Sequence, residues 1–141
     1  MNRYSYPALL TPEEEGGYVV IFRDLPEAIT QGDTIEESLS EASDCLAEAI
    51  AARIDDCRQI PKTSEPKTHE YRIVVPLHIA LKAALYEAIE ESGLANTQLG
   101  ERLGKDEKEI RRILDPHHGT KLPTLETALK ALGKEPELFL S

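Results

Sequence analysis

The sequence predicts an α+β fold in which a small antiparallel sheet with one helix precedes an all-helical domain. β-prone runs separated by turn residues fill the first part, and only helical spacing of apolar residues follows residue 76. Between them, 59–70 is polar and contains two prolines, as linkers do. We therefore expect domains at 1–69 and 76–141. The β-branched run at 70–75 is expected to be a strand, and whether it completes the first sheet or belongs to the second domain is left open.

The first domain opens with strands. Residues 3–10 and the run YVVIF at 18–22 flank an acidic turn with two glycines, TPEEEGG, and this arrangement predicts a β-hairpin. A third strand is expected near 28–31, ended by a turn at Gly32 and Asp33.

A helix follows the third strand. Apolar residues recur at steps of three and four between Ile35 and Ile54 and form one stripe. Thr34 and Glu37 have the spacing of a capping box, in which the hydroxyl and the carboxylate each satisfy a backbone N–H at the helix start. One helix laid across a small sheet is the simplest packing that buries both apolar faces.

The second domain shows helical signals only. Pro76 suits a first helical turn, and an apolar stripe from Leu77 to Ile89 predicts a helix that Gly93 ends. Three shorter helices are expected at 96–103, 106–114 and 124–132.

The first two short helices have the spacing of a helix-turn-helix, with the small residue Gly100 where they would cross. Asp106 and Glu109 form a second capping-box pattern at the start of the later helix. The apolar residues that can face a shared core are Leu99, Leu103, Ile110, Ile113 and Leu114.

The segment NTQLGERLGKDEKEIRRILDP, followed by LPTLETALKALG, resembles the helix-turn-helix domains of phage repressors. In that class the second helix lies in the major groove, and flanking residues hold phosphates. Arg and Lys can pair with guanine edges, and Glu can accept from cytosine. The resemblance implies these DNA contacts: Asn96, Lys105, Glu107, Lys108, Arg111, Arg112 and Lys121. The alternative is that Arg111 and Arg112 only pair with neighbouring acids on a solvated face.

Charge is distributed unevenly. The chain has a net charge of −10, which argues against sequence-independent binding of nucleic acid. Residues 1–69 hold 6 Lys and Arg against 14 Asp and Glu, whereas residues 70–141 hold 10 against 12. This asymmetry indicates two domains with different partners, and the acidic first domain suits a basic one.

The first domain is similar to the N-terminal domain of HicB antitoxins. The similarity rests on the motif FRDLP at 22–26 and on the turn TQGDTIEES at 30–38. It implies a degenerate ribonuclease-H-like sheet and helix that binds a HicA-type toxin, a basic RNA-cleaving protein. The candidate toxin contacts are Tyr18, Phe22, Asp24, Glu27 and Asp33. The acids at 13–15 either add negative potential for the toxin or form a solvated loop.

Our hypothesis is a non-enzymatic antitoxin. The first domain sequesters the toxin, and the second domain, as a homodimer or tetramer, binds the operator of its own operon. One alternative is a one-component repressor whose first domain binds a small effector. Another is a residual magnesium-dependent nuclease, for which Asp24 is a single acid where a cluster is needed.

No cofactor or metal is expected. Cys45 and Cys57 lack zinc-site spacing, and the pair His117 and His118 has no third ligand at helical spacing. Cys45 is expected to be a reduced, packed thiol. No apolar run approaches the roughly 18 residues of a membrane span, and no N-terminal signal is present. We therefore expect a cytoplasmic protein without a membrane partner.

Overall fold

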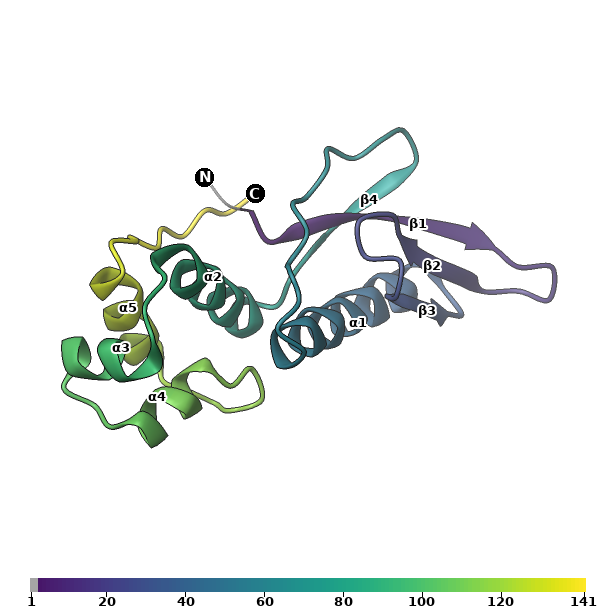
Figure 1. The fold of residues 1–141 in the computed structure, drawn as a ribbon. Helices are drawn as coiled ribbons and strands as arrows, with labels where there is room; N and C mark the ends of the chain where they lie inside the picture. Colours follow the sequence, from purple (N-terminus) through teal and green to yellow (C-terminus); the bar gives the residue numbers. More distant parts are fainter. Residues whose placement is uncertain (1–2) are drawn as a thin grey trace. The chain divides into compact units, whose positions relative to one another are not determined.

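The computed structural model describes residues 3–141, which contain a four-stranded antiparallel sheet and five helices (Figure 1). This confirms the predicted α+β class. The chain divides into two compact units, here called the N-terminal and C-terminal units. The boundary falls between Ala80 and Leu81, inside the second helix. The elements are β1 (Ser5–Pro12), β2 (Tyr18–Phe22), β3 (Ile29–Gly32), α1 (Ile35–Asp55), β4 (Glu70–Val74), α2 (Leu77–Ser92), α3 (Asn96–Leu103), α4 (Glu107–Leu114) and α5 (Leu122–Ala131).

The sheet has the strand order β3-β2-β1-β4. β1 and β2 form the expected hairpin, with Ala8 opposite Phe22, and the acidic turn is closed by a hydrogen bond from the N–H of Glu13 to the carbonyl of Gly17. β4 pairs with β1, with Tyr71 opposite Ala8. The run whose place the sequence left open is therefore an edge strand of the sheet.

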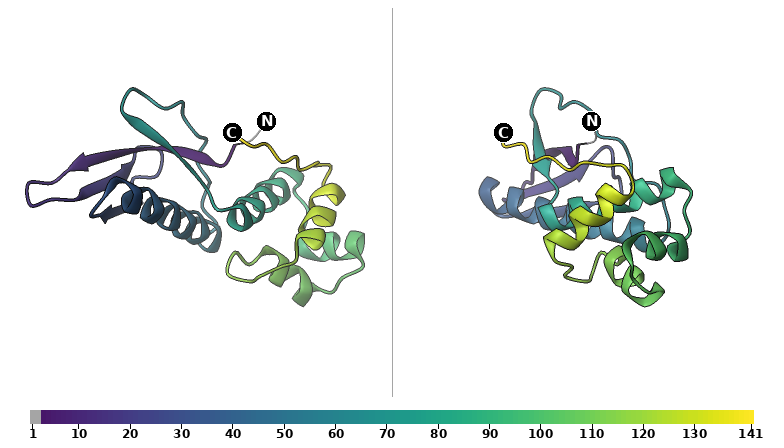
Figure 2. Two further views of the ribbon diagram at one scale, coloured as in Figure 1. Left: turned by 180° about the vertical axis from the view of Figure 1, so that it is seen from behind. Right: turned by 90° about the vertical axis from the view of Figure 1, so that its left-hand side faces the viewer.

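α1 packs across one face of the sheet and contacts all four strands (Figures 1 and 2). Its N-cap is Thr34, whose hydroxyl accepts a hydrogen bond from the N–H of Glu37 at 3.1 Å. The Glu37 carboxylate accepts from the N–H of Asp33 rather than from that of Thr34, so the second half of the predicted capping box is shifted by one residue. Side chains that are almost fully buried between helix and sheet include Tyr6, Ala8, Val20, Phe22, Ala42, Leu46 and Ile50.

The long connection between α1 and β4 lies on the other side of the sheet from α1 (Figure 2). It is held by polar contacts. The Asp24 carboxylate accepts hydrogen bonds from the backbone N–H and the hydroxyl of Ser64, at 2.8 and 2.7 Å. The Tyr6 hydroxyl donates to the carbonyl of Pro61 at 2.7 Å. These contacts fix a segment whose composition suggested a free linker.

The C-terminal unit buries a single apolar cluster drawn from α2, α3, α4 and α5. Its fully buried members are Leu85, Ala88, Leu99, Ile110, Ile113, Leu125, Ala128 and Leu129. Leu77 was predicted to join this stripe but is 59% exposed, because only later residues of α2 belong to the cluster. α5 begins at Leu122, two residues before the expected start, with Pro123 in its first turn.

A tight turn joins α3 to α4. Gly104 has a φ of 66°, a left-handed conformation that suits glycine, and the N–H of Lys105 donates to the carbonyl of Gly100 at 2.9 Å. A Cβ on Gly100 would lie 2.6 Å from the carbonyl oxygen of Lys105. Only glycine therefore permits this close return of the backbone.

Over the residues described, none of the helices combines the length and the apolar character of a bilayer-spanning segment. Both cysteines are free, and burial raises the pKa of the Cys45 thiol.

Gly100→Ala should destabilise the C-terminal unit, because the new Cβ meets backbone atoms that have no freedom to move aside. We expect the free energy of unfolding to fall by about 1–3 kcal/mol, the usual cost of overpacking. Denaturant unfolding followed by circular dichroism measures this. Gly119→Ala is the matched control, since a Cβ at Gly119 meets nothing within 4 Å. Equal stability of the two variants would contradict the close approach at Gly100.

Candidate nucleic-acid and protein interfaces

The orientation of α4 is set by its apolar side. Ile110 and Ile113 are 0% and 4% exposed and belong to the apolar cluster of the C-terminal unit. The opposite side of the helix is left in solvent. The exposed residues of α4 include four of the predicted DNA contacts: Glu107, Lys108, Arg111 and Arg112. α4 thus presents three basic side chains to solvent, on a helix whose orientation is set by the burial of Ile110 and Ile113.

The acids near α4 are largely engaged in holding the helix. Asp106 caps it by accepting from the N–H of Glu109 at 2.8 Å, and Glu109 forms an ion pair with Lys105 at 3.5 Å. Within residues 3–141, Arg111 and Arg112 form no ion pair with these acids. The two guanidinium groups are therefore available to a ligand. Their positive charges lie in the last turn of α4, where the negative end of the helix dipole stabilises them.

The remaining predicted DNA contacts flank α4. Asn96 is the half-buried first residue of α3, and Lys121 is exposed directly before α5. Lys105 lies in the turn before α4, where its ammonium forms an ion pair with Glu109.

Sequence analysis missed Lys82, which is 1% exposed. Its Nζ donates to the carbonyls of Ile113 at 2.7 Å and Arg112 at 3.2 Å, and to the hydroxyl of Thr120 at 2.7 Å. Burial lowers the pKa of Lys82 to about 8, an effect that the charge of Asp115 opposes. The spacing of residues in α2 indicates this burial, because Lys82 lies three residues before Leu85 and so shares the apolar face of the helix.

The predicted toxin contacts in the N-terminal unit separate into two groups. Phe22 is 1% exposed and packs in the core, so its side chain offers no surface to a partner. The Asp24 carboxylate accepts two hydrogen bonds from Ser64. Glu27 forms an ion pair with Arg53, with Nη2 and Oε1 2.9 Å apart, and the hydrogen bonds from Arg53 lower the pKa of the Glu27 carboxyl. These three residues have structural partners.

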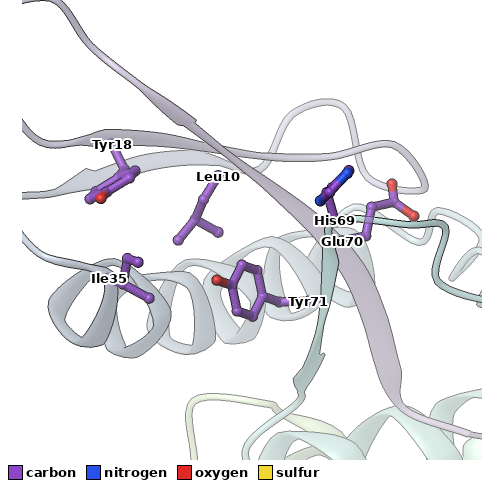
Figure 3. Close-up of a pocket in the computed structure, with 6 residues that line it drawn as sticks. All are labelled: Leu10, Tyr18, Ile35, His69, Glu70 and Tyr71. Carbon is purple, nitrogen blue, oxygen red and sulfur yellow. The ribbon is translucent and has the colours of Figure 1, made fainter.

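Tyr18 and Asp33 remain accessible and lie at the same end of the sheet. Tyr18 is half-buried and pairs with Gly32 across β2 and β3, which places it beside the exposed Asp33. Tyr18 also lines a surface pocket of about 380 Å³ (Figure 3). We call four residues of that lining the aromatic patch: Leu10, Tyr18, Ile35 and Tyr71.

The aromatic patch has the chemistry of a protein contact. Figure 3 shows Leu10 pointing from β1 into the space between Tyr18, Ile35 and Tyr71. Ile35 and Tyr71 are 38% and 39% exposed. Partly exposed aromatic rings beside aliphatic groups are common centres of protein interfaces. Sequence patterns could not group these residues, because β1, β2, α1 and β4 each supply one.

The lowered pKa of Lys82 predicts a pH-dependent stability. The folded value of about 8 lies below the ordinary value of 10.5, so between these pH values the unfolded chain binds more protons. The free energy of unfolding should therefore rise with pH in this window, by at most about 1.4 kcal/mol per pH unit. Denaturant unfolding of the wild type and Lys82→Met, repeated across the window, isolates this contribution. A difference between the two proteins that does not change with pH would rule it out.

Comparison with known proteins identifies the family. A family model described as a HicB-like antitoxin of bacterial toxin-antitoxin systems matches residues 5–84. The chain is 42% identical to the antitoxin HicB of Escherichia coli K12, over 96% of this chain and 98% of that protein. It is 41% identical to antitoxin HicB 1 of Photorhabdus laumondii, over 96% and 86%, and 34% identical to antitoxin HicB of Pseudomonas fluorescens, over 90% and 88%. The chain therefore belongs to the HicB family of antitoxins.

Proposed function

We propose that this antitoxin has two separate activities. The N-terminal unit binds and neutralises a basic, RNA-cleaving toxin of the HicA type. The C-terminal unit is a helix-turn-helix that binds the operator of its own operon and represses transcription. The observation that carries the second activity is α4, with Ile110 and Ile113 buried and with Lys108, Arg111 and Arg112 exposed and not paired with the neighbouring acids.

DNA recognition requires charged donors on a rigid helix. In the proposed complex α4 lies in the major groove, where Arg111 and Arg112 pair with guanine edges and Lys108 adds a further donor. Asn96, at the start of α3, and Lys121, directly before α5, contact phosphates on either side of α4. Because the whole chain is acidic, a single copy binds weakly, and we propose a homodimer that places two such helices one DNA turn apart.

Toxin binding uses the acidic unit. The aromatic patch supplies apolar contact area, while Asp33 and the hairpin acids at 13–15 supply negative potential that attracts a basic toxin and speeds its encounter. The patch lies on the surface, with Tyr71 39% exposed. A small effector is usually enclosed over most of its surface, so this geometry favours a protein partner over a small ligand.

Replacing both Arg111 and Arg112 with Ala should weaken binding to the DNA upstream of the gene by at least about thirtyfold, because each lost guanine contact costs about 1–3 kcal/mol. Fluorescence anisotropy with a labelled duplex measures this. The control replaces Lys130 and Lys134 with Ala. It removes the same charge from exposed lysines that pair with Glu126 and Glu91.

The control variant should keep most of its operator affinity, and both variants should still bind the toxin. Equal loss of operator affinity in the two variants would show that general charge, not the α4 surface, governs DNA binding. Loss of toxin and DNA binding together in a folded protein would contradict the separation of the two activities.

Co-expression with the small protein encoded beside the gene should yield a complex and rescue growth. Tyr18→Ala should weaken that complex by about tenfold or more, mainly through faster dissociation, because an aromatic anchor is removed. Surface plasmon resonance gives both rates. Phe139→Ala removes a ring that is 77% exposed in the C-terminal segment and should leave the rates unchanged. If no partner is recovered and growth is not rescued, the antitoxin activity is not exerted through this neighbour.

A further inference from the structure

Lys82 is the only charged side chain among the buried residues of the described chain. It lies in α2, in a unit whose core is otherwise apolar. A buried ammonium is costly unless it is hydrogen-bonded, and apolar residues are the usual occupants of a helix position that faces an apolar core. The presence of lysine here therefore calls for a role beyond filling space.

The three acceptors of Lys82 indicate that role. Two are the carbonyls of Arg112 and Ile113, in the last turn of α4, where carbonyls lack the partners that a further helical turn would supply. The Arg112 carbonyl also accepts from the N–H of Asp115 at 3.3 Å. The third is the hydroxyl of Thr120, which itself donates to the carbonyl of Arg112 at 3.4 Å. A positive charge at this end of a helix is also favoured by the helix dipole.

This contact joins two parts of the proposed DNA surface. It fixes the backbone of Arg112, whose side chain is exposed. It also fixes Thr120, the residue directly before Lys121. The last turn of α4 and the end of the segment that leads into α5 are thus both held by a single buried atom on α2, the Nζ of Lys82. Recognition of base edges needs such support, because small displacements of the contacting groups lose their hydrogen bonds.

We propose that Lys82 is a positioning residue for operator recognition, which sets the pose of α4 and of Lys121 without touching DNA. The inference rests on the proposed DNA-binding function. Loss of Lys82 should misplace the base-contacting groups while leaving the exposed positive charges in place. Sequence-specific binding should therefore fall, whereas binding through phosphates, which tolerates small displacements, should persist.

The test is the ratio of affinities for two duplexes of equal length at one salt concentration: the DNA upstream of the gene and a scrambled sequence. In Lys82→Met the affinity for the upstream DNA should fall by about tenfold or more, with the scrambled affinity within about twofold of wild type. Lys130→Met, the same substitution at an exposed lysine, should leave the ratio unchanged. Thr120→Val removes one acceptor with little change in shape and should lower the ratio in the same direction by a smaller factor.

Partial unfolding would reduce both affinities by the same factor, so an unchanged ratio in Lys82→Met overturns the positioning role. If Lys82→Met does not fold, the result for Thr120→Val decides, and a wild-type ratio in that variant overturns the proposal. A wild-type chain that shows no preference for the upstream DNA fails at the earlier step and contradicts the proposed function itself.

Discussion

Ile110 and Ile113 have lost almost all contact with water, and the rest of the C-terminal unit is arranged around them. Their burial fixes the rotation of α4 about its own axis, and this rotation decides which side chains face solvent. The glycine-dependent turn before the helix and the lysine contact at its end then fix its two ends. A helix of this length is only marginally stable alone, so its orientation comes from these tertiary contacts.

The N-terminal unit relies more on polar contacts at its edges. The FRDLP motif illustrates this, because its residues act mainly in the scaffold. Phe22 and Leu25 are buried, Asp24 holds Ser64, and Arg23 pairs with Glu70 at the start of β4 at 2.9 Å. A motif that carries the resemblance to the HicB family therefore attaches the long connection and the edge strand to the sheet.

Much of the fold follows from local patterns in the sequence. The hairpin, α1 and the two short helices around Gly104 were placed within a few residues, because strand alternation, helical spacing and capping residues act over short distances. The roles of Phe22 and Asp24 were harder to predict, since burial depends on which face of a strand meets the helix and on where a distant loop returns. The aromatic patch was invisible for the same reason, as its members come from four elements.

Lys82 shows a different limit. A lysine between apolar residues on a helix usually extends to solvent, and nothing local announces that its partners lie at Arg112, Ile113 and Thr120. Only the packing of α2 against the end of α4 reveals them. Residue-type expectations therefore fail where a charge is stabilised by contacts that are distant in the sequence.

The division of α4 into a buried and an exposed side has an evolutionary consequence under the proposed function. Substitutions at Lys108, Arg111 or Arg112 alter what the helix presents to DNA, whereas those at Ile110 or Ile113 alter whether the unit folds. Operator preference can therefore diverge by single steps that carry little penalty in stability. A genome with several such systems could keep its operons separately regulated while every copy retains one scaffold.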